Sequence, residues 1–164
     1  MSTAHPMPRP ALVAALGALT STLMFASASP AEAATLKQRA LKIAAAQKGD
    51  PYKYGAAGPD KFDCSGLTSY SYKKAGKKIP RTAQGQYNAS RRIGQKAREK
   101  GDLVFIGRSS GSIYHVGIYA GFWDGKGWMW NANSKSYRGR KVVLAPIREY
   151  TKGAPRAFYG QVKP

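Results

Sequence analysis

FDCSGL, at residues 62–67, joins an aromatic loop to a helix and carries the only cysteine of the 164-residue chain. The loop before it, residues 49–62, is rich in glycine, proline and aromatic residues. After it, residues 65–74 place apolar side chains at helical spacing, and Gly76 is suited to end that helix. The sequence therefore predicts that Cys64 stands at the start of a helix.

A thiol at a helix start is a candidate nucleophile. The unpaired backbone N–H groups there and the positive end of the helix dipole favour the thiolate, and they lower the pKa of a cysteine from near 8.5 to roughly 3.5–7.5. An exported domain stabilised by disulfides would carry an even set of cysteines, and a single one cannot form such a bridge. The alternative is that Cys64 is a small buried apolar residue with no chemical role.

The rest of the chain predicts an α+β domain. Thr35 can cap a helix that Gly49 ends, and a short helix followed by irregular chain is expected after Pro80. Beyond residue 100 the pattern changes to strands, which we expect at residues 103–106, 113–120, 127–132, 142–146 and 157–162. Helices followed by an antiparallel sheet are typical of this fold class.

His115 is the candidate base. In its strand, Val116 and Ile118 share one face, so the imidazole is turned away from that apolar face. The other histidine, His5, falls in the leader segment described below. A cysteine hydrolase made from this chain would therefore have to use His115 to activate its thiol. The alternative is an ordinary surface histidine.

A third polar group is expected to orient the imidazole. Asn131 lies on the strand face opposite Trp130, and its amide oxygen can accept the ring N–H of a histidine. Asn133 is a nearby rival for the same role. Each asparagine could instead be a turn or edge residue.

The first 33 residues have the pattern of a secretory signal peptide. Arg9 precedes an apolar run of about 16 residues, and Ala-Glu-Ala at 31–33 supplies the small residues of a cleavage site. The run is shorter than the roughly 18–20 residues that span a bilayer. We expect cleavage near Ala33 or Ala34, which leaves one secreted domain at residues 34–164; an uncleaved membrane anchor is the alternative.

The net charge of +19 belongs to the predicted mature domain, because residues 1–33 remove only Arg9 and Glu32. Such a charge attracts a polyanion: nucleic acid, anionic lipid or an acidic cell wall. Secretion favours the wall, so we expect peptidoglycan and anionic wall polymers as partners of a monomeric domain, with no nucleic acid and no stable membrane insertion. A generic solubilising surface is the alternative.

Five ordered blocks of the chain resemble the NlpC family of papain-like cell-wall peptidases over about residues 36–147. The blocks are GDPYKYG at 49–55, FDCSGL at 62–67, PRTA at 80–83 with Gln86 after it, GDLVF at 101–105 and HVGIY at 115–119. The resemblance implies a papain-like fold, with N-terminal helices packed on a C-terminal antiparallel sheet. It also implies a catalytic triad of Cys64, His115 and Asn131 that hydrolyses the D-glutamyl to diamino-acid bond of peptidoglycan stem peptides.

Further residues are carried over by the same resemblance. Tyr52 matches a tyrosine near the nucleophile whose hydroxyl could help to hold the oxyanion, and Asp63, Ser65 and Arg81 match positions that line the substrate groove. The alternatives for these three are a helix cap, its partner and a surface cation. The orienting position is often histidine in the family, and here it is Asn131.

No metal or other cofactor is expected, because the predicted mature chain has one cysteine and one histidine and so lacks the ligands of a typical zinc site. Two functions compete with the endopeptidase. One is a wall amidase or a lipid acyltransferase of the same broad class, although such acyltransferases place the histidine before the cysteine. The other is a non-catalytic cationic protein that binds the wall.

Overall fold

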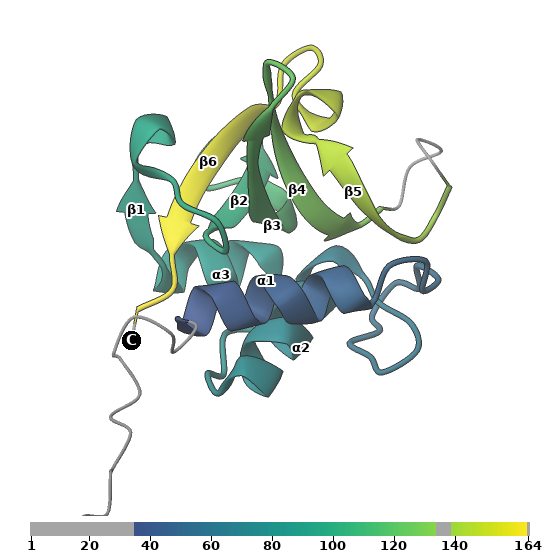
Figure 1. The fold of residues 1–164 in the computed structure, drawn as a ribbon. Coiled ribbons are helices and arrows are strands. Elements are labelled where there is room, and N and C mark those ends of the chain that lie inside the picture. Colours follow the sequence, from purple (N-terminus) through teal and green to yellow (C-terminus); the bar gives the residue numbers. More distant parts are fainter. Residues whose placement is uncertain (1–34, 134–138, 164) are drawn as a thin grey trace, which may run out of the picture. The chain divides into compact units, whose positions relative to one another are not determined.

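The computed structural model describes residues 35–133 and 139–163, which form a helical layer packed on one sheet (Figure 1). The helices α1 (Leu36–Ala46), α2 (Cys64–Ala75) and α3 (Ala83–Ala89) come first. The strands follow with two short 3-10 helices among them: β1 (Arg91–Ile93), η2 (Gln95–Ala97), β2 (Leu103–Gly107), β3 (Ile113–Trp123), β4 (Lys126–Ala132), β5 (Val142–Pro146), η3 (Ile147–Tyr150) and β6 (Arg156–Gln161). The predicted α+β class is confirmed.

The six strands form one antiparallel sheet in the order β1-β6-β2-β3-β4-β5. Its two central strands are β2 and β3, so the strand that carries His115 is supported on both sides. All five predicted strands are present within a few residues of their expected ends. The sheet also contains the edge strand β1, in a segment that was expected to be irregular chain.

Local sequence features explain where the helices begin and end. Thr35 caps α1 in a capping box with Gln38, and Gly76 ends α2 in the left-handed conformation at φ 112°. β3 continues past its predicted end to Trp123, because Asp124 and Gly125 both have positive φ, at 51° and 66°, and form a tight two-residue hairpin into β4.

Apolar side chains cover both faces of the sheet. One core lies between the sheet and the helices and includes Leu67, Phe105 and Val116. A second core lies on the opposite face and includes Met129 and Tyr150. His115 is therefore turned away from Val116 as expected, yet it is only 6% exposed, because the second face is covered as well.

The predicted signal peptide, residues 1–33, lies outside the described residues. Within the described ranges, no helix has the length and apolar character needed to cross a membrane.

Candidate active site

Cys64 is the first residue of α2, as the sequence predicted. Its sulfur lies close enough to the backbone N–H groups of Ser65 and Val116 for them to lower the pKa of the thiol. Val116 follows His115 along β3, so this contact brings the thiol from the helical layer to the strand that carries the imidazole. Cys64 thus lies beside the backbone of the strand that carries His115, a residue 51 positions further along the sequence.

The ionisation of the thiol differs from the expectation. Burial raises the pKa of Cys64 above its ordinary value, and the nearby carboxylate of Asp63 raises it further. Hydrogen bonds from Val116 and Ser65 act in the opposite direction without cancelling that effect. The helix start acts in the predicted direction, but the loss of water around the sulfur outweighs it, so the net lowering of the pKa that the sequence predicted is not found. A thiol in this setting holds its proton until a base accepts it.

His115 and Asn131 lie side by side on the sheet. His115 Nε2 is 3.1 Å from Asn131 Oδ1, and both residues are buried. Asn131 Nδ2 donates to the carbonyl of Val143 at 3.4 Å, which fixes the direction of the amide. Because a carbonyl oxygen only accepts, Nε2 must carry the proton in this pair. A neutral His115 then has its basic lone pair on Nδ1.

Tyr150, in η3, completes this group and was not predicted from the sequence. Its hydroxyl donates to Asn131 Oδ1 at 2.8 Å, and its ring stacks on the imidazole of His115 with centroids 4.8 Å apart and planes 7° apart. One residue thus contacts both members of the pair. No sequence pattern distinguishes it among the ten tyrosines of the chain, because it lies in a short turn after β5.

The rival Asn133 lies elsewhere. It is buried just after β4, and its Nδ2 donates to the carbonyl of Gly139 at 3.1 Å. That contact holds the two ends of the β4–β5 connection together. Asn131 is the asparagine whose contact with His115 the described residues show.

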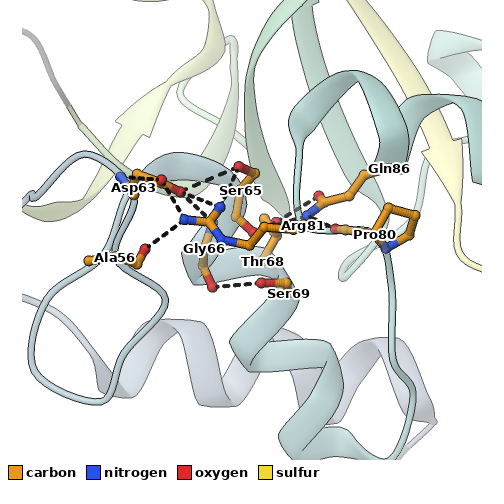
Figure 2. Close-up of polar contacts among 10 residues, drawn as sticks. Ala56, Asp63, Ser65, Gly66, Thr68, Ser69, Pro80, Arg81 and Gln86 are labelled. Carbon is orange, nitrogen blue, oxygen red and sulfur yellow. Dashed lines mark hydrogen bonds and ion pairs between the residues drawn. The ribbon is translucent and has the colours of Figure 1, made fainter.

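The start of α2 is held by an ionic network around Asp63 (Figure 2). Asp63 is the N-cap of α2 and accepts hydrogen bonds from the backbone N–H groups of Gly66, at 2.6 Å, and Gly55, at 2.8 Å. Arg81 reaches both oxygens of the same carboxylate, at 2.9 and 2.6 Å, and also contacts Ser65 Oγ at 3.0 Å. Arg81 is therefore the ionic partner of the cap rather than a solvated surface cation.

Asp63 remains ionised because of this network. Burial alone would raise the pKa of its carboxyl, but the hydrogen bonds from Arg81, Gly66 and Gly55 and the charge of Arg81 outweigh burial and hold that pKa below its usual value. Together with the Ser65 hydroxyl, which donates to Asp63 at 3.4 Å, these donors fix the loop, the helix start and the segment before α3 around one carboxylate.

Gln86 adds a neutral link between α3 and α2. Its Nε2 donates to the carbonyls of Ser65, at 3.0 Å, and Pro80, at 2.9 Å, while its Oε1 accepts from Thr68 at 2.7 Å (Figure 2). Gln86 is almost fully buried, so all of its polar atoms need such partners. These bonds explain why a glutamine follows the PRTA block.

An open cleft of about 450 Å³ leads to the thiol. Five of the predicted residues line it: Tyr52, Asp63, Cys64, Ser65 and Arg81. His115 and Asn131 are not among the residues that line the cleft. Burial raises the pKa of the Tyr52 hydroxyl, so this group keeps its proton at neutral pH and can donate it in a hydrogen bond. Within the described part of the chain, no group of three or more histidine, cysteine or acidic residues could hold a metal ion.

Comparison with known proteins identifies relatives of this domain. The NlpC/P60 family matches residues 49–155. The bifunctional muramidase/DL-endopeptidase CwlT of Bacillus subtilis is 44% identical over 102 residues, which are 60% of this chain and 29% of CwlT. A probable endopeptidase of Corynebacterium glutamicum is 44% identical over 96 residues, which are 58% of this chain and 44% of that protein. The chain thus spans less than half the length of these two relatives.

Solved structures resemble the whole domain. The P60 domain of a Mycobacterium avium subspecies paratuberculosis antigen is 34% identical at a TM-score of 0.63, covering 77% of this chain and 94% of that domain. RipD of Mycobacterium tuberculosis, described as a non-catalytic NlpC/p60 protein adapted to peptidoglycan binding, is 25% identical at a TM-score of 0.62, covering 79% of this chain and 98% of that one. By the family match and these likenesses, the chain belongs to the NlpC/P60 family.

Proposed function

We propose that the chain is a cysteine endopeptidase that cuts the D-glutamyl to diamino-acid bond of peptidoglycan stem peptides. Cys64 is the nucleophile, His115 the general base and Asn131 the residue that orients the imidazole. The single observation that carries the proposal is that a thiol lining an open cleft lies beside the backbone of the strand that carries His115, whose Nε2 is bonded to Asn131. The relatives named as endopeptidases support the reaction type.

The first step forms an acyl-enzyme. His115 Nδ1 accepts the proton of the Cys64 thiol, and the sulfur attacks the scissile carbonyl carbon. Because burial raises the pKa of Cys64, proton transfer to His115 is needed for attack at neutral pH. The protonated imidazole then gives its proton to the leaving amine, the C–N bond breaks, and the D-glutamyl carbonyl remains on sulfur as a thioester.

The second step releases the product. His115 accepts a proton from a water molecule that attacks the thioester, and the thiol is restored as the acid leaves. In both steps negative charge develops on the carbonyl oxygen. The backbone N–H of Cys64 lies in the first turn of α2, where it has no intrahelical acceptor, and Tyr52 supplies a second donor from the cleft wall.

Asp63, Ser65 and Arg81 form one wall of the proposed substrate groove. Their hydrogen bonds to one another fix the shape of that wall beside the thiol. The Arg81 side chain is 41% exposed, so its outer edge can also meet a carboxylate of a stem peptide.

The cellular setting belongs to the same proposal. Residues 1–33 direct secretion and are removed, and residues 34–164 act in the cell wall without stable insertion into a membrane. The net charge of +19 supports attraction to anionic wall polymers.

RipD supports a second candidate function, because a domain of this family can bind peptidoglycan without catalysis. In that case Cys64 would be a structural residue and the cleft a binding groove. A wall amidase is the alternative within enzymes.

Digestion of purified peptidoglycan separates the three functions. The wild-type protein is expected to release fragments that end in D-glutamate and others that begin with the free amine of the diamino acid, as identified by mass spectrometry. Fragments cut between muramic acid and alanine would establish an amidase. Cys64→Ala is the matched control, with circular dichroism and wall sedimentation to verify fold and binding. Equal wall binding with no fragments from either protein would establish the non-catalytic function.

A further inference from the structure

A second pocket, of about 430 Å³, shares no lining residue with the catalytic cleft and is strongly basic. Four cations line it, and we call it the arginine pocket: Arg98, Lys126, Arg148 and Arg156. The exposed ring of Phe122 and the buried ring of Tyr159 lie beside these cations. β3 borders both pockets, because Ile113 near its start lines the catalytic cleft and Phe122 near its end lines the arginine pocket.

Arg98 is held in place by aromatic rings. Its guanidinium carbon lies 4.8 Å from the ring centroid of Tyr119 and 5.2 Å from that of Tyr159. Its Nε is buried and has no hydrogen-bond partner within the described residues, while Nη1 donates to the carbonyl of Gln95. A guanidinium fixed in this way loses little side-chain entropy when an anion arrives, and it has donor capacity to offer that anion.

The protein neutralises this charge only in part, through Glu149, whose pKa is lowered mainly by Lys152 and further by Arg148 and Lys126. Among residues 35–133 and 139–163, no ion pair involves Arg98, Lys126 or Arg156. Arg148 Nε is 4.0 Å from Glu149, but Glu149 is bound more closely by Lys152, at 2.6 Å. The pocket therefore keeps a surplus of positive charge.

We propose that the arginine pocket binds a phosphodiester group of an anionic wall polymer. Three of its four cations are arginines, whose planar forks match the geometry of phosphate oxygens. The exposed Phe122 ring offers a face for the sugar or polyol carbons between phosphates. Because the pocket and the cleft share no lining residue, the polymer can hold the protein on the wall while a stem peptide occupies the thiol site.

A phospholipid surface fits this region less well. The exposed aromatic residues nearest the pocket are Phe122 and Trp123, which are 62% and 39% exposed. Adjacent residues of a strand point to opposite faces, and Trp123 stacks on Trp128 rather than beside Phe122. The two rings therefore do not form one apolar patch that could enter a bilayer.

Arg148→Gln/Arg156→Gln tests the proposal without removing the packed Arg98. Binding of a soluble poly(glycerol phosphate) chain is measured by isothermal calorimetry, together with its salt dependence. We expect the double variant to bind about tenfold more weakly, as the loss of charge-assisted hydrogen bonds predicts. The matched control is Arg91→Gln/Arg108→Gln, which removes the same charge from two exposed arginines outside the pocket and should change binding less than about threefold.

Several results would overturn the proposal. Equal losses in both double variants would mean that the overall charge, and not the pocket, attracts the polymer. Equal binding of poly-L-glutamate would exclude phosphate as the recognised group. Binding to phosphatidylglycerol vesicles in place of the polymer would identify a membrane site, and no measurable binding of the polymer by the wild-type protein would remove the site altogether.

Discussion

The two sides of the candidate active site are held by different kinds of interaction. On the helix side, the residue before Cys64 is an ionised carboxylate bound by Arg81 and by backbone N–H groups. On the sheet side, His115 is held by a neutral amide and a neutral phenol in a buried core. The position of the nucleophile thus depends on charge, and the position of the base depends on neutral hydrogen bonds and packing.

This difference has physical consequences. The carboxylate contacts require ionised Asp63 and weaken when it is protonated. The contacts among His115, Asn131 and Tyr150 contain no carboxylate, so an acid pH that neutralises Asp63 does not remove an acceptor there. Variants on the two sides should therefore differ in how large their effects on activity and stability are, and also in how those effects depend on pH.

The largest effect is expected at His115, where the two sides meet. In His115→Ala the thiol loses its base, and because burial raises the pKa of Cys64 no other described group lowers it enough to replace that base. We expect a loss of roughly 10²–10⁴-fold in kcat/KM on a stem-peptide substrate, the usual scale for a general base.

Alkylation of Cys64 by iodoacetamide at pH 7 reports the same step without substrate. It should be much slower in His115→Ala than in the wild-type protein, while circular dichroism stays unchanged. Alkylation at the wild-type rate would mean that His115 does not activate the thiol. The sheet side of the site would then not supply the base for Cys64.

A smaller effect is expected at Asn131. Asn131→Ala removes the acceptor that holds Nε2–H, so the imidazole can turn or change tautomer, but the base remains. We expect about a tenfold loss in kcat with little change in KM, equivalent to one buried hydrogen bond. Asn133→Ala, a buried asparagine two residues away that contacts Gly139, is the control. Equal losses in both variants would indicate a general defect of β4.

On the helix side, Arg81→Gln should destabilise the fold by about 1–2 kcal/mol at pH 7, a value reduced because the arginine is partly exposed. The contacts hold the pKa of Asp63 below its ordinary value near 3.9, so their stabilisation is complete above about pH 5 and is lost as the pH falls through the folded-state pKa. The difference between wild type and variant, measured by urea unfolding, should therefore shrink toward zero at low pH.

Arg91→Gln, at an exposed arginine, is the control for that titration and should change the unfolding free energy by less than about 0.5 kcal/mol at any pH. A difference for Arg81→Gln that stays constant with pH would mean that packing of the side chain, and not its charge on Asp63, stabilises the start of α2.

Local sequence was sufficient for the elements that position the site. Gly76, the apolar spacing after Cys64 and the alternation around His115 are properties of neighbouring residues, so the helix start and the strands could be predicted. β1 could not, because Arg91 and Arg92 are exposed and the three-residue strand forms only by pairing with β6.

Two features of the site depend on contacts distant in sequence and were missed for that reason. The direction of the Cys64 pKa is set mainly by burial beneath β3, which a local argument about the helix dipole omits. Tyr150 reaches His115 only because η3 folds back over the second face of the sheet. The roles of Cys64, His115 and Asn131 remain predictions that the variants above test.

The smallest effect is expected from Tyr150→Phe. This variant tests whether the position of His115 on the sheet side depends on Tyr150 as well as on Asn131. The ring and its stacking on His115 remain, and only the hydroxyl that donates to Asn131 is lost. We expect about a threefold to tenfold loss in kcat, an unchanged KM and roughly 1 kcal/mol less stability. Tyr87→Phe, at a buried tyrosine of the other core, should leave kcat unchanged. If the two variants lose equal stability and neither loses kcat, Tyr150 only fills the core. A selective loss of kcat, with slower alkylation of Cys64 at pH 7, would make Tyr150 a positioning residue that acts through Asn131.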